Sequence, residues 1–570
     1  MRRTNPSLGV VACATVGLTA LLFSGCTNEP MSDTASPSAQ VGTVARVDVP
    51  AVTIDLPAEP RPWDNSDEAL VEAVRAANGL VSITFKEPGS PRALVTGRRE
   101  AVGRASLQAG TALVTGLGGE ILHELRFIGA VLARIDPAAA SALRANPLVD
   151  FVEPNQRYEV HHVLYEGDAP QVLGRATGAP GAPGSTEYWD WGVWYMDAGS
   201  AWAYSTGVGA KYMHISTGHE QGHPDLPFVP TNNCGGTYGG CDDGPYGNYP
   251  GTNYLGQAVE RWNGIGWVGV APGVAGTDTY SWGACEVTGP SSSTCYTGQV
   301  AAGLDAARLV GAKVAFLGTY YSFYDATVAT AVANAWQYGD IVMVAPAGNV
   351  PDGVPGQPQY PAAHDHVLGV SGIKPDYSFA GSGTCLAGFG SQYGSHVDVT
   401  AAFWSTATWG GGGYNVICTT NVGAGLVAGV AALMRAYRPG DDADAVIRGI
   451  KNSASALGDP QYFGAGLPNA LKAVRDPPPP PSPITASISG PRSVKPNVYC
   501  TWFASASGGH PPYTYTWYKN SGYAGTGSEI QLHTGTSSFY LKVTATDAWN
   551  ERGNQEIYVT VTSSARVCFT

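Results

Sequence analysis

The sequence predicts an α/β protein in which a parallel, doubly wound sheet lies between a smaller α/β domain and an all-β sandwich. Three observations predict this arrangement. Short apolar runs alternate with helical patterns over residues 187–475, which favours a parallel sheet covered by helices on both faces. Residues 76–160 read strand–helix–strand–strand–helix–strand, the order of a split βαβ or ferredoxin-like domain. Short Thr- and Val-rich strands over residues 484–570 indicate a β-sandwich.

The composition excludes several classes of protein. The 570 residues include 74 glycines and 41 prolines, while charged residues make up 14% and aromatic residues 10%. Disordered chains are rich in charge and poor in aromatic residues, so disorder throughout is excluded. A long helical or coiled-coil protein is excluded because that much Gly and Pro would interrupt it. The formal net charge of −13 leaves little to neutralise phosphates, so no nucleic-acid partner is expected.

Residues 1–25 have the pattern of an export signal. Arg2 and Arg3 precede an apolar run over residues 8–23, and small residues follow it, as in a secretory signal peptide. Because Cys26 comes directly after the small residues, the segment resembles a bacterial lipoprotein signal, which implies that Cys26 carries the lipid. An ordinary signal peptide and an uncleaved anchor are the alternatives. The expected location is outside the cytoplasm, at the cell surface or in the periplasm, with membrane contact through the lipid alone.

Apart from Cys13 and Cys26, the remaining cysteines are expected to form disulfides. An even number of cysteines in an exported chain favours disulfides. Pairing nearest neighbours gives the most local of many options: Cys234–Cys241, Cys285–Cys295, Cys385–Cys418 and Cys500–Cys568. Zinc is the competing interpretation, but the cysteines form no tight pairs and no histidine cluster accompanies them.

The remaining segments follow from local patterns. Residues 26–75 lack periodicity and are expected to tether the chain, while 161–186 and the proline-rich 476–483 are expected to be linkers. In the small domain, strands are expected at 80–85, on both sides of Gly129 and at 149–153, with helices at 101–117 and 137–145. In the central domain, strands are expected at 211–215, 314–317, 341–345 and 366–371, and helices at 299–309, 326–337, 422–437 and 444–453.

A series of motifs in the central domain resembles the subtilisin-like serine peptidases. In chain order they are Ser216-Thr217-Gly218 with His223-Pro224-Asp225-Leu226, Pro250-Gly251-Thr252-Asn253 with Gly269-Val270-Ala271-Pro272, Ala347-Gly348-Asn349, and 427–433. Residues 76–160 resemble the propeptide of this family, so the resemblance covers about residues 76–475. Many motifs in the family's order argue against coincidence.

The resemblance places the catalytic triad of the family at residues that cannot perform its chemistry. The Asp, His and Ser of the family correspond to Ser216, Pro250 and Asn421, and the intervals to neighbouring motifs fix this register. A serine becomes a nucleophile when an imidazole takes its proton and a carboxylate orients the imidazole. Asn349 corresponds to the oxyanion residue, which without a nucleophile only binds a carbonyl group. None of the triad is therefore expected to be intact.

Two further residues correspond to calcium ligands of the family. Asp225 and Asn263 match a carboxylate and an amide that help to bind a structural calcium there, and calcium takes oxygen ligands of these kinds. Ordinary loop capping by both residues is the alternative. No other cofactor is expected.

Residues 484–570 resemble bacterial surface modules of the polycystic-kidney-disease (PKD) or immunoglobulin-like type. The resemblance rests on residues 508–513, Trp517 and residues 539–547. Such sandwiches serve as spacers or bind glycans and proteins.

Three functions stay open. The first is a surface-anchored protein without catalysis that binds an extended peptide or protein segment by β-strand addition. In that case the link near residues 158–164 stays uncut and the small domain covers the groove. The second is an active serine endopeptidase with displaced groups, such as Thr420 as nucleophile and His214 as base. The third is an adhesin that acts through residues 484–570. A His–carboxylate pair beside a hydroxyl in the cleft would contradict the first.

Overall fold

The computed structural model describes residues 52–53, 66–86, 98–99, 104–164, 174–175, 188–236, 240–241, 250–476, 483–509, 513–546 and 552–565. The expected signal peptide, Cys26 and Cys568 lie outside these residues. Within these ranges, no helix combines the length and the apolar character that a membrane crossing requires.

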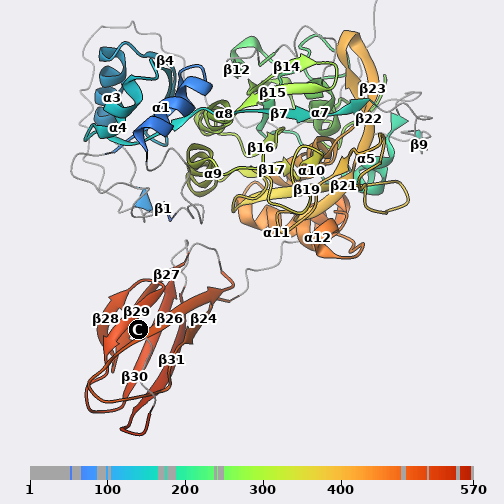
Figure 1. The fold of residues 1–570 in the computed structure, drawn as a ribbon. Helices are drawn as coiled ribbons and strands as arrows, with labels where there is room; N and C mark the ends of the chain where they lie inside the picture. The colour runs from blue at the N-terminus through green and yellow to red at the C-terminus, as the bar shows by residue number, and fades with distance from the viewer. Residues whose placement is uncertain are drawn as a thin grey trace, which may run out of the picture. The chain divides into compact units, whose positions relative to one another are not determined.

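A seven-stranded sheet forms the centre of the larger domain (Figure 1). Its order is β12–β13–β11–β16–β17–β19–β21, and every pair of neighbours is parallel. The bounds are β11 Tyr212–Ser216, β12 Cys234–Gly236, β13 Thr279–Gly283, β16 Val314–Leu317, β17 Val342–Pro346, β19 Val367–Ile373 and β21 Val399–Ala402. The inner strands are buried along their whole length, which explains why apolar residues dominate their sequences.

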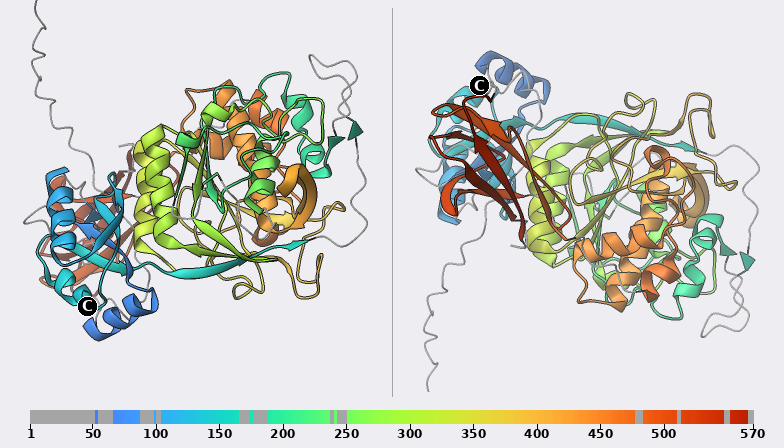
Figure 2. Two further views of the ribbon diagram at one scale, coloured as in Figure 1. Left: turned by 90° about the horizontal axis from the view of Figure 1, so that it is seen from above. Right: turned by 90° about the horizontal axis from the view of Figure 1, so that it is seen from below.

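Helices cover this sheet (Figure 2). Helix α8 (Thr297–Val310) packs against α9 (Ala326–Gly339), and α7 (Pro250–Val259) packs against α10 (Thr420–Tyr437). Helices α11 (Ala443–Ser453) and α13 (Ala470–Arg475) pack against α10. The short helices are α5 (Trp191–Tyr195), α6 (Ala198–Ala201) and α12 (Pro460–Phe463). Each strand and helix expected in the central domain overlaps one of these elements, so the alternating pattern is confirmed.

The small domain is a four-stranded antiparallel sheet with helices packed on it. The sheet order is β4–β5–β2–β6. The bounds are α1 Asp67–Ala76, β2 Leu80–Phe85, α3 Arg104–Gly116, β4 Glu120–Leu125, β5 Ala130–Arg134, α4 Ala139–Ala145 and β6 Val149–Pro154. From β2 to β6 the order of the elements is the expected one.

The expected boundary between tether and small domain is wrong. Residues 67–75, assigned to the tether, lie in helix α1, which Ser66 caps by accepting a hydrogen bond from Ala69 N. Leu70 and Val74, four positions apart on one face of this helix, are fully buried in the domain's core. The α1 helix is therefore part of the small domain.

The expected linker at 161–186 is also wrong for its first residues. Strand β7 (Arg157–His161) pairs antiparallel with β15 (Ser292–Tyr296), which pairs with β14 (Cys285–Gly289). Strand β8 (Val163–Leu164) pairs with β23 (Gly413–Cys418), which pairs with β22 (Trp404–Trp409). The segment after the small domain therefore adds to two sheets of the central domain.

The C-terminal residues form two further sheets, with orders β24–β26–β29 and β25–β31–β30–β27–β28. Trp502 and Trp517 are fully buried in the core that the two sheets share. The bounds are β24 Thr485–Ser489, β25 Ser493–Val494, β26 Tyr499–Ser507, β27 Thr514–Lys519, β28 Gly522–Thr526, β29 Glu529–His533, β30 Phe539–Thr546 and β31 Arg552–Val561.

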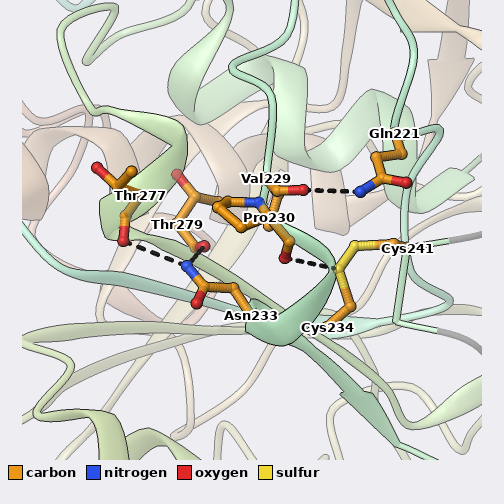
Figure 3. Close-up of a disulfide and its surroundings, with 8 residues drawn as sticks. All are labelled: Gln221, Val229, Pro230, Asn233, Cys234, Cys241, Thr277 and Thr279. Atoms are coloured by element: carbon orange, nitrogen blue, oxygen red, sulfur yellow. Dashed lines mark hydrogen bonds between the residues drawn. A yellow bond between two sulfur atoms is a disulfide. The ribbon is translucent and has the colours of Figure 1, made fainter.

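Three of the expected disulfides form: Cys234–Cys241, Cys285–Cys295 and Cys385–Cys418. Beside the first, the side-chain amide of Asn233 donates to the carbonyl oxygens of Thr277 and Thr279 (Figure 3). These bonds fix the short segment that leads into β12. Cys500 is disulfide-bonded as well, while its expected partner, Cys568, lies outside the described residues.

Replacing Leu70 with Ala tests whether α1 belongs to the core of the small domain. Truncating a buried leucine costs about 2–5 kcal/mol, so Leu70→Ala is expected to speed amide hydrogen exchange in α1 and β6 of the full chain. The Glu72→Ala variant alters an exposed side chain of the same helix and should change exchange little. Equal exchange in the two variants would show that α1 is not part of the core.

Candidate functional site

Ser216 lies at the carboxyl edge of the central sheet, where parallel α/β proteins place their sites. It is the last residue of β11 and is buried. Its Oγ makes no hydrogen bond to any residue that the structure describes. A neutral hydroxyl supplies none of the negative charge with which a carboxylate orients and stabilises an imidazolium.

Pro250 begins α7 next to the end of β11. The N–H of Gly251 donates to Thr217 Oγ1 at 3.1 Å, which joins the first turn of the helix to the residue after Ser216. Proline suits this place because the N–H of a first-turn residue has no partner within the helix. Its side chain has no atom that can accept a proton.

Asn421 is the second residue of α10, two positions after the helix cap. Thr419 caps the helix, and its Oγ1 accepts from the backbone N–H of Asn421 at 3.4 Å and from Nδ2 at 3.3 Å. The side chain is fully buried. An amide has no hydroxyl or thiol to act as a nucleophile.

The side-chain amide of Asn349 connects the parts of the site. Its Oδ1 accepts hydrogen bonds from Thr420 N at 3.0 Å and from Thr420 Oγ1 at 3.1 Å. Its Nδ2 lies 2.8 Å from Thr419 Oγ1, 2.9 Å from the Tyr320 hydroxyl and 3.0 Å from the carbonyl oxygen of His161. One buried amide therefore fixes the start of α10 and presents a donor to a carbonyl group of another segment.

Residues 157–164 lie across this site as an extended strand. In β7, His161 lies opposite Ser292 of β15. In β8, Leu164 lies opposite Ile417 of β23. Figure 1 labels β7 together with β15 and β23, the two strands that pair with this segment. The backbone therefore pairs with other strands both before and after the His161 carbonyl along the chain. A peptide bound by strand addition has this geometry.

One His–carboxylate pair does lie at this site, near the Tyr320 hydroxyl. His161 Nδ1 is 2.6 Å from Asp352 Oδ1, and the Tyr320 hydroxyl donates to Asp352 Oδ2 at 2.6 Å. The hydrogen bond to Asp352 and the charge of this carboxylate raise the pKa of His161. The imidazole, however, belongs to the segment that occupies the cleft, and the hydroxyl contacts the carboxylate. Burial also raises the pKa of Tyr320 well above its ordinary value, which opposes formation of a nucleophilic phenolate.

Thr420 and His214, the displaced groups considered from the sequence, make no contact with each other among the described interactions. Thr420 Oγ1 donates to Asn349 Oδ1, and the His214 ring stacks on Phe316 with the centroids 5.2 Å apart. Burial, together with the charge of the neighbouring His219, lowers the pKa of His214 to about 3. The His214 imidazole is therefore neutral at neutral pH, with an apolar ring against it.

Asp225 and Asn263, the two expected calcium ligands, both make hydrogen bonds to neighbouring protein groups. Asn263 Nδ2 donates to the carbonyl oxygen of Pro224 at 3.2 Å, and its Oδ1 accepts from Ile265 N at 3.1 Å. Asp225 Oδ2 accepts from Trp267 N at 3.1 Å and from the Tyr414 hydroxyl at 2.9 Å. One oxygen of each side chain therefore accepts hydrogen bonds from protein donors in this arrangement. Calcium binding stays a prediction from the resemblance.

The expectations drawn from the sequence include neither Asp352 nor Tyr320. Asp352 follows the Asn349 motif by one turn, in which Asp352 N donates to Asn349 O at 3.0 Å. The sequence does show an acidic residue soon after the oxyanion motif, and this proximity could have marked Asp352 as a candidate site residue. Tyr320 lies in a run of aromatic residues after β16, which does not distinguish it from its neighbours.

No protein-family model matches this chain. Thermitase from Thermoactinomyces vulgaris is 31% identical over 289 residues, which cover 49% of this chain and 94% of that protein. Subtilisin Savinase from Lederbergia lenta is 31% identical over 293 residues, covering 50% of this chain and 98% of that protein. M-protease from Shouchella clausii (strain KSM-K16) is 29% identical over 364 residues, covering 62% of this chain and 82% of that protein.

Solved structures of similar fold include a second named relative of subtilisin. Fervidolysin from Fervidobacterium pennivorans, described as a keratinolytic enzyme related to subtilisin, matches 85% of this chain and 76% of its own, with a TM-score of 0.53. The sequence identity is 18%, so this likeness concerns the fold alone.

Replacing Asn349 with Ala tests the bridging role of the amide. The change leaves Thr420 N and the buried oxygens around it without their partner. Each buried group left unpaired costs about 1–3 kcal/mol, so the unfolding midpoint of the central domain should fall. Denaturant unfolding followed by tryptophan fluorescence measures it. Gln357→Ala, an exposed change in the following loop, should leave the midpoint unchanged. An unaltered midpoint in Asn349→Ala would contradict the bridging role.

Proposed function

This chain belongs to the subtilisin-like serine peptidases, and from that premise we propose that it is a member without a working triad whose cleft binds an extended peptide segment. Among the relatives named above, M-protease is a protease by name. The proposal is that this chain keeps their fold and lacks the protease activity. An active endopeptidase that uses displaced groups is the alternative.

The side chains at the three triad positions support the loss of catalysis. Ser216 offers a hydroxyl in place of a carboxylate, Pro250 offers no proton acceptor, and Asn421 offers no nucleophile. Removing any one member of such a triad leaves only about 10³–10⁴-fold acceleration over water, which comes from binding and the oxyanion hole. With all three changed, this cleft keeps the means to bind a peptide and lacks the means to form an acyl intermediate.

The observation that carries the proposal is the carbonyl group of His161 at Asn349. The 3.0 Å contact puts this carbonyl at the donor that corresponds to the oxyanion residue of the family. The peptide bond from His161 to His162 therefore occupies the place of a bond to be cut. Thr419 Oγ1, at the cap of α10, is engaged with Asn349 and Asn421.

We take the small domain to be the family's propeptide, retained as a lid. The Glu153 carboxylate accepts hydrogen bonds from Ala326 N at 3.1 Å and Thr327 N at 2.8 Å, at the start of α9. Asn155 Oδ1 accepts from Gly298 N at 2.7 Å, at the start of α8. Helix N-termini favour such acceptors because their first N–H groups have no partner within the helix. These contacts hold the start of the bound segment to the central domain.

Export and anchoring complete the proposal. We place the protein outside the cytoplasm, held by a lipid on Cys26, with residues 484–570 as a PKD- or immunoglobulin-like module. The disulfides support an oxidising location. An adhesin acting through residues 484–570 is the other alternative, and deletion of this module would then abolish ligand binding. If the cleft binds the ligand, deletion leaves binding intact.

Restoring the triad tests whether only the chemistry is missing. The triple change Ser216→Asp, Pro250→His and Asn421→Ser should yield a chain that cuts its own His161–His162 bond, because that bond already lies at the site. Peptide mapping by mass spectrometry identifies the cut. The matched control carries the first two changes and keeps Asn421, so it should stay intact. Cleavage of the unaltered chain at the same bond would contradict the proposal.

The unaltered protein should resist labelling by a fluorophosphonate and keep its full mass through residues 157–164. A fluorophosphonate reacts with an activated serine or threonine hydroxyl, and no such group is expected here. Intact-mass measurement on pure recombinant protein detects both labelling and cleavage. A label on Thr419 or Thr420, or a new N-terminus at His162, would favour the active alternative.

A further inference from the structure

We propose that Asp352 makes this cleft selective for a positively charged side chain at the position that His161 occupies. The ligand that replaces residues 157–164 is then a basic segment of another protein. This inference rests on the proposed function, because it requires a cleft that binds a peptide without cutting it.

Asp352 is a carboxylate in a largely enclosed place. Its side chain is 8% exposed, whereas that of His161 is 38% exposed. One oxygen of Asp352 lies 2.6 Å from His161 Nδ1, and the other accepts from the Tyr320 hydroxyl at 2.6 Å. A carboxylate removed from water is costly unless a cation or several donors compensate it. A neutral apolar side chain in place of His161 would leave this charge with one fewer partner.

Tyr320 orders the contacts around the bound residue. A phenol has one hydroxyl hydrogen, and the shorter contact assigns it to Asp352. Its oxygen then accepts from the backbone N–H of His161 at 3.1 Å and from Asn349 Nδ2 at 2.9 Å. The same hydroxyl therefore positions both the carboxylate and the backbone of the residue that the carboxylate binds.

The turn from Asn349 to Asp352 fixes which residue is selected. Asp352 N donates to Asn349 O at 3.0 Å, so the two side chains start from one tight turn. Asn349 binds the carbonyl oxygen of His161, while Asp352 binds its imidazole. A ligand whose carbonyl meets the amide must place the side chain of that same residue at the carboxylate. The selectivity is therefore positional as well as electrostatic.

A second anchor sets the spacing of the ligand. Tyr158, three residues before His161, is buried with its ring centroid 4.7 Å from that of Tyr321 and 6.0 Å from that of Phe323. Its hydroxyl accepts from Thr319 Oγ1 at 2.8 Å. The ligand class is therefore an extended segment with an aromatic residue, two intervening residues and then a cationic residue.

The charges around the imidazole favour its protonated form. Asp352 faces Nδ1, and Glu159 Oε2 lies 3.8 Å from Nε2. The adjacent His162 stays neutral, because burial and the charge of His161 lower its pKa to about 4. Glu159 belongs to the bound segment, so of these two carboxylates Asp352 is the one that the central domain supplies. The net charge of −13 also favours the approach of a basic partner.

The contact should weaken as the pH rises. The folded-state pKa of His161 is raised. The stabilisation that the His161–Asp352 contact gives to the bound segment is therefore fully present below the ordinary pKa of 6.5 and is lost as the pH rises through the raised pKa. An arginine at this position stays charged over the whole range. Comparison of His161 with His161→Arg therefore separates the charge of the side chain from every other effect of pH.

Hydrogen exchange of residues 157–164 in the full chain provides the first test. At pH 6, His161→Leu and Asp352→Asn are expected to speed this exchange about tenfold or more, whereas His161→Arg preserves protection. Above the raised pKa, protection in the unaltered chain should fall below that of His161→Arg. Glu159→Gln is the matched control for a carboxylate beside the imidazole, and exchange in α10 controls for folding. Equal protection in His161→Leu and the unaltered chain would overturn the inference.

Competition by synthetic peptides provides the second test. The peptide Tyr-Glu-Val-Arg-His-Val-Leu should release the chain's own segment at a lower concentration than the same peptide with Leu in place of Arg. In Asp352→Asn the two peptides should become equivalent. Equal competition with the unaltered chain would overturn the selectivity. Intact mass in each sample keeps this outcome separate from failure of the proposed function, which would appear as a cut chain or a cut peptide.

Discussion

The buried amide of Asn349 is the constraint on which the cleft depends. Both ends of an amide must find partners when it is buried, and here its oxygen holds the first turn of α10 while its nitrogen faces Thr419, Tyr320 and the bound carbonyl. These partners come from segments far apart in the chain. Their positions are linked because one planar group must satisfy them together. The same group therefore sets the register of anything bound in the cleft.

This constraint explains how a cleft built for catalysis can serve recognition. In an enzyme, an oxyanion donor is useful because its hydrogen bond strengthens as charge develops on the carbonyl oxygen. Without a nucleophile no charge develops, and the donor contributes only to binding of the unreacted peptide. The groups around Ser216 and His214 are neutral and buried, whereas the charge in the cleft lies at Asp352, against a side chain of the bound segment. The charge of Asp352 therefore determines which side chain binds and does not stabilise charge on a reacting atom.

Much of the fold could be predicted because its signals are local. The apolar runs at 314–317 and 367–373 are strands. Helix α8 ends before Gly311, whose left-handed backbone conformation favours glycine. The register of Ser216, Pro250 and Asn421 followed from intervals between short motifs, and the structure places these residues at the end of β11 and the starts of α7 and α10. The contact between His161 and Asp352 could not be predicted, because it joins a strand after the small domain to a turn after β17. Local periodicity carries no information on such a pair. Helix α1 was missed because its apolar face is short and its sequence otherwise resembles the polar segment before it.

The most direct test of the account is an experimentally determined structure of the full chain with its natural residues. The account predicts continuous density through the bond from His161 to His162, with the His161 carbonyl oxygen within hydrogen-bond distance of Asn349 Nδ2. A break in the chain at this bond would contradict it, as would the Oγ1 of Thr419 or Thr420 bonded to the carbonyl carbon of His161.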